Sequence, residues 1–172
     1  MRPFLVILFT VCLAGLASAF QQPTNPWATV PRPPQVVSAP YDSKAERQLL
    51  DLANQDRAEA GLAPLQSDEG LTRAARKHSE LMASRKELSH DLPGEPALPQ
   101  RFAATSTLQF SAEGENVGPA PSAAEVHRGF MHSQHHRDNL LNPDYNVAGF
   151  AVVHSGSTIF VTEVFGHGLP SR

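Results

Sequence analysis

The chain has 172 residues, with 14 lysines and arginines against 17 aspartates and glutamates, and its formal net charge is −3. This length and an apolar share of 41% are typical of one ordinary globular domain. The mild acidity argues against a nucleic-acid partner, because no basic run is longer than Arg76-Lys77.

Residues 1–19 have the pattern of a secretory signal peptide. Arg2 supplies a basic start, residues 4–16 are apolar, and the segment closes on the small residues Ala17-Ser18-Ala19. The apolar run is shorter than the roughly 20 residues that a membrane-spanning helix needs, so no stable membrane span is expected. We predict cleavage after Ala19 and a secreted or periplasmic protein.

The single cysteine, Cys12, lies inside this segment. The exported chain would therefore be free of cysteine, which excludes disulfides, thiol catalysis and zinc-thiolate sites. Residues 20–42 are rich in proline and predict an extended spacer. The folded domain is expected over residues 43–168, followed by a short tail at 169–172.

Several segments carry apolar residues at helical spacing together with a helix start or stop signal. The expected helices run from Ser43 to Gly61, from Ser67 to about Lys86, over 100–104, from Ser122 through Met131, and over 134–141. Ser43 with Glu46, and Ser122 with Glu125, have the spacing of a capping box.

The end of the chain changes to the pattern of β-strands. Residues 147–154 and 158–165 are rich in β-branched and aromatic residues, and Ser155-Gly156-Ser157 between them predicts a hairpin. Gly149 indicates a close backbone approach or a bulge. Helices followed by a hairpin that must be covered predict an α+β layered domain.

Histidine is the residue type that could carry chemistry, because no cysteine remains and a transition metal would need imidazole and carboxylate ligands. His132 and His136 are four residues apart and can share a helix face, but Ser133 stands where a metalloprotease would have its glutamate. Exposed surface histidines are the alternative interpretation of His132 and His135.

A second set is formed by His90, Glu115 and His136, each expected at the end of an element, where functional side chains often converge. Spacing alone leaves open whether these three residues meet. Elsewhere, His78 is expected to be a hydrogen-bonded core residue, Asn54 and Arg57 to anchor loops, and Asn116 and Asn139 to satisfy backbone groups.

Several ordered motifs resemble the bacterial branch of the CAP superfamily, the cysteine-rich secretory proteins, antigen 5 and pathogenesis-related proteins, also called the SCP domain. They are the runs at 54–65 and 75–82, Ser89-His90, Gly114-Glu115-Asn116-Val117, the run at 133–141 and Val164-Phe165-Gly166. The resemblance covers residues 45 to 166.

This resemblance implies an α-β-α sandwich, with a central antiparallel sheet between helical layers and a groove on one side. His90 and His136 match the family's zinc-binding histidines, and Glu115 matches its glutamate. The second acidic residue of eukaryotic members falls near Ser133. The chain departs from the family pattern at Phe130, Gln134 and His135, where Trp, Pro and Gly are typical, so His135 is a possible extra ligand. Ser133 and Asn116 are further candidate site residues.

Two functional hypotheses follow for this site, and they leave open whether the domain is an enzyme. The favoured one is a binding module that holds zinc and receives a peptide, glycan or lipid in the groove. The alternative is a zinc-dependent, peptidase-like hydrolase in which Glu115 activates a metal-bound water. A third interpretation is a purely structural hydrogen-bonded cluster.

Overall fold

The computed structural model describes residues 41–169; the predicted signal peptide and almost all of the predicted spacer lie outside this part of the chain. The described helices are α1 (Ser43–Glu59), α2 (Glu69–Arg85), α3 (Leu98–Ala103), α4 (Ala123–His132) and α5 (Gln134–Leu140). The strands are β1 (Gln66–Ser67), β2 (Gln109–Ala120), β3 (Val147–Ser155) and β4 (Thr158–Leu169).

The strands form one sheet with the order β1-β3-β4-β2. The predicted hairpin is confirmed as β3 and β4, whose turn includes Gly156 at a φ of +64°. The predicted antiparallel sheet is correct for β2, β3 and β4, but the short β1 pairs in parallel with β3, so the sheet is mixed.

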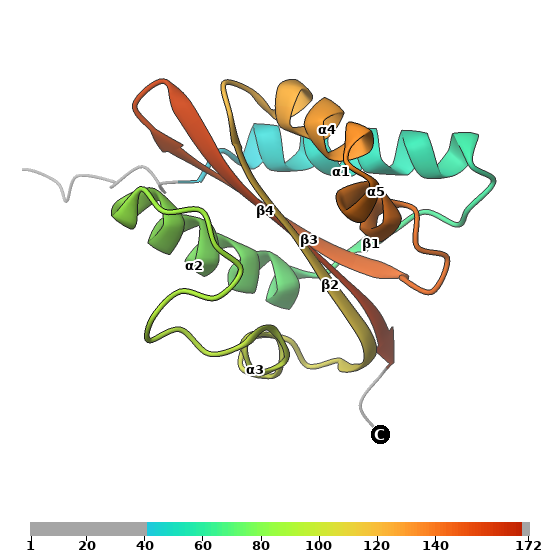
Figure 1. Cartoon of the computed structure of the whole chain (residues 1–172). Helices are drawn as coiled ribbons and strands as arrows, with labels where there is room; N and C mark the ends of the chain where they lie inside the picture. The colour runs from blue at the N-terminus through green and yellow to red at the C-terminus, as the bar shows by residue number, and fades with distance from the viewer. Residues whose placement is uncertain (1–40, 170–172) are drawn as a thin grey trace, which may run out of the picture. The chain divides into compact units, whose positions relative to one another are not determined.

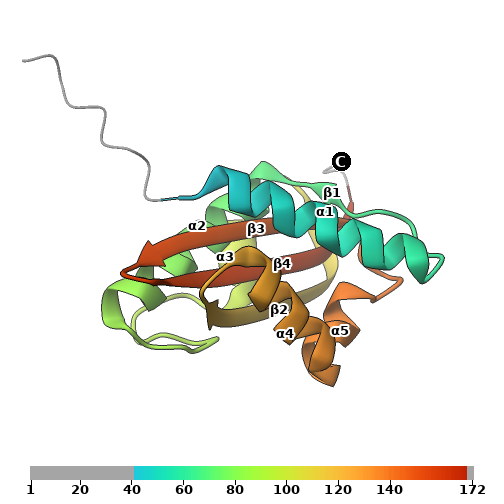
Figure 2. The same ribbon diagram turned by 90° about the horizontal axis from the view of Figure 1, so that it is seen from above.

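Helices cover both faces of this sheet, as the α-β-α sandwich requires (Figures 1 and 2). Helices α1, α4 and α5 lie on one face, and α2 and α3 lie on the other. Each face has its own apolar core: Leu49, Phe130 and Phe165 belong to the first, and Leu71 and Phe102 to the second. The expected fold class is therefore confirmed.

The first two helix starts differ from the prediction by one residue. Asp42, not Ser43, caps α1 by accepting a hydrogen bond from the Ala45 backbone at 3.0 Å. Asp68, not Ser67, caps α2. The carboxylate forms the cap, which leaves Ser67 free to pair in β1. At α4 the predicted Ser122 cap is confirmed.

Gly149 is the closest point between the sheet and α2, as its isolated position in a strand pattern indicated. A Cβ atom there would overlap the backbone of Leu71 and Thr72. This contact sets the start of α2 directly against β3. Between residues 41 and 169, no helix is long and apolar enough to cross a bilayer.

Candidate functional site

The predicted site residues gather around β2, the strand at one edge of the sheet. Side chains of a strand alternate between the two faces. Val117 packs in the cluster of Met82 from α2, whereas a Cβ on Gly118 would meet Phe130 of α4. Glu115 therefore faces the α2 layer and Asn116 faces the layer of α4 and α5.

His90 lies in the loop between α2 and α3 and approaches β2 from the α2 side. Its Nδ1 is 2.9 Å from Oε1 of Glu115, while 55% of the side chain remains exposed. The hydrogen bond to the carboxylate raises the pKa of His90 above its ordinary value, although partial burial opposes the shift. A carboxylate accepts from Nδ1–H, so this contact leaves Nε2 of His90 facing away from Glu115.

Glu115 is almost fully buried and is held at both oxygens. Nη1 of Arg101 lies 2.8 Å from Oε2, as an ion pair whose N–H bond does not point directly at the oxygen. Burial alone would raise the pKa of Glu115, but the hydrogen bond of His90 and the charge of Arg101 outweigh it and leave that pKa below its ordinary value. Glu115 is therefore an ionised carboxylate at neutral pH.

His136 lies near the start of α5 and approaches the same strand from the other face. The side-chain amide of Asn116 donates to its backbone carbonyl at 3.1 Å, and its ring packs against Phe130 with the centroids 4.8 Å apart. Its Nδ1 is buried without a hydrogen-bond partner among the described residues. Burial, together with the charges of His90 and His135, lowers the pKa of His136.

Two asparagines connect these residues beneath the surface, as the sequence indicated. Asn139 of α5 donates to the Glu115 carbonyl at 3.2 Å and to Oδ1 of Asn116 at 2.9 Å. Asn116 also donates to Oε2 of Glu163 at 3.1 Å. The amide groups therefore tie α5 to the two neighbouring residues of β2 on which the site is built.

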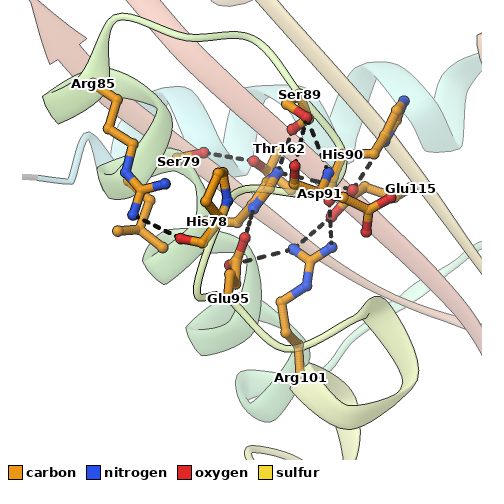
Figure 3. Close-up of polar contacts among 12 residues, drawn as sticks. His78, Ser79, Arg85, Ser89, His90, Asp91, Glu95, Arg101, Glu115 and Thr162 are labelled. Carbon is orange, nitrogen blue, oxygen red and sulfur yellow. Dashed lines mark hydrogen bonds and ion pairs between the residues drawn. The ribbon is translucent and has the colours of Figure 1, made fainter.

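Sequence reasoning missed two of the charged residues below His90, Glu95 and Arg101 (Figure 3). His78 is fully buried as expected, and its Nδ1 lies 2.6 Å from Oε2 of Glu95, while its Nε2 donates to the Ser89 carbonyl at 2.9 Å. Arg101 comes from α3. Glu95 and Arg101 lie in or beside a segment rich in proline and glycine that has no periodic signal, so nothing in the sequence singled them out.

Glu163 was also missed. It is fully buried in β4, its Oε1 has no hydrogen-bond partner among the described residues, and burial raises its pKa to about 8, with the Asn116 hydrogen bond opposing the shift. The available signal was a charged residue inside an otherwise apolar strand, which is uncommon without a pairing partner.

The remaining candidates lie at the periphery. His132 and His135 are exposed, which fits the surface interpretation, and Ser133 joins α4 to α5 without a side-chain cap. Within residues 41–169, no group of three or more histidines, cysteines, aspartates or glutamates is arranged to hold a metal ion. Any metal bound here would therefore have fewer than three such ligands from the described residues.

None of the three described cavities is lined by His90, Glu115 or His136. The largest, about 470 Å³, lies between α1 and α2 above Phe150, toward the opposite edge of the sheet. A cavity of about 200 Å³ lies beside Glu95 and Arg101, and a third of about 250 Å³ beside His154.

Comparisons with known proteins agree with this architecture. The model of the CAP family, described as the cysteine-rich secretory protein family, matches residues 50–165. The uncharacterized protein YkwD of Bacillus subtilis is 33% identical over 132 residues, which cover 76% of this chain and 51% of that protein. The chain thus spans about half the length of this curated relative.

Solved structures support the same fold. An extracellular protein containing a SCP domain from Bacillus anthracis matches with a TM-score of 0.67 and 28% identity, covering 73% of this chain and 41% of that chain. An outer surface protein from Borrelia burgdorferi shares the fold with a TM-score of 0.66 and 17% identity, covering 73% of this chain and 94% of that chain. The family match includes most of α1 and the strands that carry the site, so this chain belongs to the CAP family.

Proposed function

We propose that this CAP domain is an exported binding module in which His90 and His136 bind a zinc ion beside the groove that the family resemblance implies along β2. In this proposal the groove receives an extracellular ligand, with peptides, glycans and lipids as the candidate classes. Glu115 acts on the site through His90.

The observation that carries the proposal is the hydrogen bond between Nδ1 of His90 and Glu115. Histidines that bind metals usually donate their other ring N–H to a carboxylate or carbonyl, which fixes the tautomer and orients the ring. Glu115 has this relation to His90, and the half-exposed imidazole offers its Nε2 outward.

His136 fits the same role from the other face of β2. Its lowered pKa keeps the imidazole neutral at pH 7, which is the form that binds a metal. Its buried Nδ1 has no partner among residues 41–169. After burial, the charge of His90 is the next contribution to the lowered pKa of His136.

Two imidazoles form an incomplete zinc shell, so the other positions would be filled by water or by a ligand oxygen. Such a site binds metal less tightly, and exchanges it more readily, than a structural site with four protein ligands. A zinc ion, when bound, would supply a Lewis acid that anchors an oxygen of a ligand lying in the groove.

The state of Glu115 favours binding over hydrolysis. Its carboxylate is engaged by His90 at one oxygen and by Arg101 at the other, and its pKa is below the ordinary value. An efficient general base at neutral pH needs a pKa near 7 and a free approach to the proton that it takes. The hydrolase hypothesis therefore gains no support from this geometry.

Export is proposed on two grounds. Residues 1–19 have the composition of a signal peptide. The similar protein from Bacillus anthracis is described as extracellular.

Calorimetric titration of the purified protein with zinc chloride tests the metal site. We expect one ion per chain, and a loss of at least tenfold in affinity in both His90→Ala and His136→Ala. His132→Ala is the matched control, since this exposed histidine at the end of α4 should leave affinity unchanged. His135→Ala shows whether His135 is an additional ligand. Equal titrations of the wild type, His90→Ala and His136→Ala would reject the site.

A further inference from the structure

A buried group of charged residues lies directly beneath His90, and we refer to it as the His90 support. It consists of His78, Glu95, Arg101 and Glu115 (Figure 3). All four side chains are at most 6% exposed, whereas the His90 side chain above them is 55% exposed. Burial of this many ionisable groups is costly unless each is paired, so their arrangement is specific.

We propose that Arg101 is the positioning residue of this site: it fixes both the ring and the backbone of His90, so that Nε2 faces the groove. The predicted effect on zinc affinity rests on the proposed function, whereas the predicted effect on the orientation of His90 does not. Arg101 belongs to α3 and belongs to none of the motifs that carry the family resemblance.

The contacts of Arg101 support this role directly. Nη1 lies 2.8 Å from Oε2 of Glu115, whose other oxygen accepts from the His90 ring. Nη2 donates to the His90 backbone carbonyl at 3.4 Å. A single planar guanidinium therefore holds His90 at two points, which a lysine with one nitrogen could not do with the same geometry.

A second connection ties the same loop to α2. Nη1 of Arg101 is also 3.8 Å from Oε1 of Glu95, and the other oxygen of Glu95 contacts Nδ1 of His78. His78 donates through Nε2 to the carbonyl of Ser89, the residue before His90. The peptides before and after His90 are thus held by buried side chains of α2 and α3.

The charges explain why the group depends on Arg101. Glu95 and Glu115 are both buried carboxylates. Nη1 of Arg101 approaches both, at 3.8 Å and 2.8 Å, and the ring of His78 lies 2.6 Å from Glu95 and 3.9 Å from Glu115. Without the guanidinium, the two acidic groups would repel each other, and Oε2 of Glu115 would have no counter-charge. Glu115 would then rotate or change its hydrogen bonding, and His90 would lose the partner that sets its tautomer.

The test uses Arg101→Met, which removes the charge at similar length, and Arg101→Lys, which keeps the charge but not the fork. Arg76→Met is the matched control: Arg76 forms hydrogen bonds with Glu46 through Nε and Nη2, and it lies on α2 away from His90. The first readout is the ¹⁵N NMR spectrum of the His90 imidazole in zinc-free protein, assigned with His90→Ala.

At a pH high enough for the His90 ring to be neutral, we expect the wild type and Arg76→Met to show a single His90 tautomer protonated at Nδ1. Arg101→Met should show a mixture of tautomers or protonation at Nε2, and Arg101→Lys should lie between the two. Zinc affinity should fall about 10- to 100-fold in Arg101→Met and remain at the wild-type value in Arg76→Met. If circular dichroism shows that Arg101→Met is unfolded, Arg101→Lys decides the question.

A wild-type His90 spectrum in a folded Arg101 variant, with zinc affinity equal to that of Arg76→Met, would overturn the proposal. A changed His90 spectrum in a protein that binds no zinc would support the role of Arg101 and reject the proposed metal site. The role of Arg101 and the proposed zinc site can therefore be rejected independently of each other.

Discussion

Glu115 and Asn116 are consecutive residues of β2, yet their side chains serve opposite faces of the sheet. Glu115 accepts from the ring of His90, which arrives from the loop after α2, and Asn116 donates to the backbone of His136 in α5. Side chains of a strand alternate between the two faces, so each of the two residues meets a different helical layer. The short Glu-Asn sequence thus joins the two layers at one place.

Zinc binding should weaken as the pH falls from 8 to 6. The pKa of His90 is raised and that of His136 is lowered, so protons compete with the metal mainly at His90. One displaced proton predicts a change of up to about tenfold in affinity per pH unit below the pKa of His90. Titration at pH 6, 7 and 8 measures it.

Glu115→Gln serves as the comparison for this pH dependence. Removing the carboxylate charge lowers the pKa of His90, so the variant should bind zinc more weakly at pH 8 but lose less affinity between pH 8 and pH 6. Identical affinities of the wild type at pH 6 and 8 would contradict the assignment of His90 as a ligand.

Glu163→Gln should change how stability depends on pH. The pKa of Glu163 is about 8 in the folded protein and near 4.5 in the unfolded chain, so the folded state binds more protons between these values. Stability therefore falls as the pH rises from 4.5 to 8, by up to about 1.4 kcal/mol per unit from this one group.

The glutamine variant keeps an acceptor for Asn116 but cannot ionise. The free energy of unfolding, measured in urea at pH 5 to 9, should thus decline less steeply in Glu163→Gln than in the wild type. Parallel curves for the two proteins would show that Glu163 does not change its protonation state in this range.

The sequence predicted the helices and the hairpin because their spacing and caps are local signals. The full length of β2 was not predictable, because Gly114, Gly118 and Pro119 lower the strand propensity. In the structure, Gly118 is needed because a Cβ there would come within 2.8 Å of the Phe130 ring. An edge position tolerates Pro119. The packing of β2 therefore requires or tolerates residues of low strand propensity, and these residues make the strand hard to recognise in the sequence.

In the candidate site, too, features with a local sequence signal were predictable and contacts that depend on tertiary packing were not. His90, Glu115 and His136 were proposed from motifs, and the hydrogen bonds of Asn116 and Asn139 to backbone carbonyls followed from their residue type. The contact of Arg101 with Glu115 was not predictable, because it joins elements whose relative position depends on the packing of α3. The spacing of apolar residues along the sequence contains no information on which side chains of separate elements meet.

Arg57→Met should destabilise the fold strongly. Arg57 is fully buried in α1 and donates to the carbonyls of Ala63, Leu140, Asn142 and Tyr145, so it ties the loop after α1, the end of α5 and the loop before β3 to one helix. Its removal leaves several buried carbonyls without donors, at about 1–3 kcal/mol each. We expect a loss of at least about 3 kcal/mol in urea denaturation.

Arg128→Met is the control for that measurement, since the Arg128 side chain is exposed on α4 and its ion pair with Glu125 is long, at 4.0 Å, and lies on the surface. Its removal should change stability by less than about 1 kcal/mol. A similar effect of both substitutions would contradict the anchoring role of Arg57.

Gly149→Ala and Gly129→Ala should shift stability in opposite directions. A methyl group at Gly149 would overlap the α2 backbone at Leu71 and Thr72, which cannot move aside like a flexible side chain, so we expect a loss of at least about 2 kcal/mol. Gly129 lies inside α4 with open space around the added atom, and alanine should stabilise the helix there by about 0.5–1 kcal/mol. Chemical denaturation of both variants measures the difference. A stable Gly149→Ala protein would mean that α2 can move away from β3, and the loop that carries His90 would then be less fixed than its contacts imply.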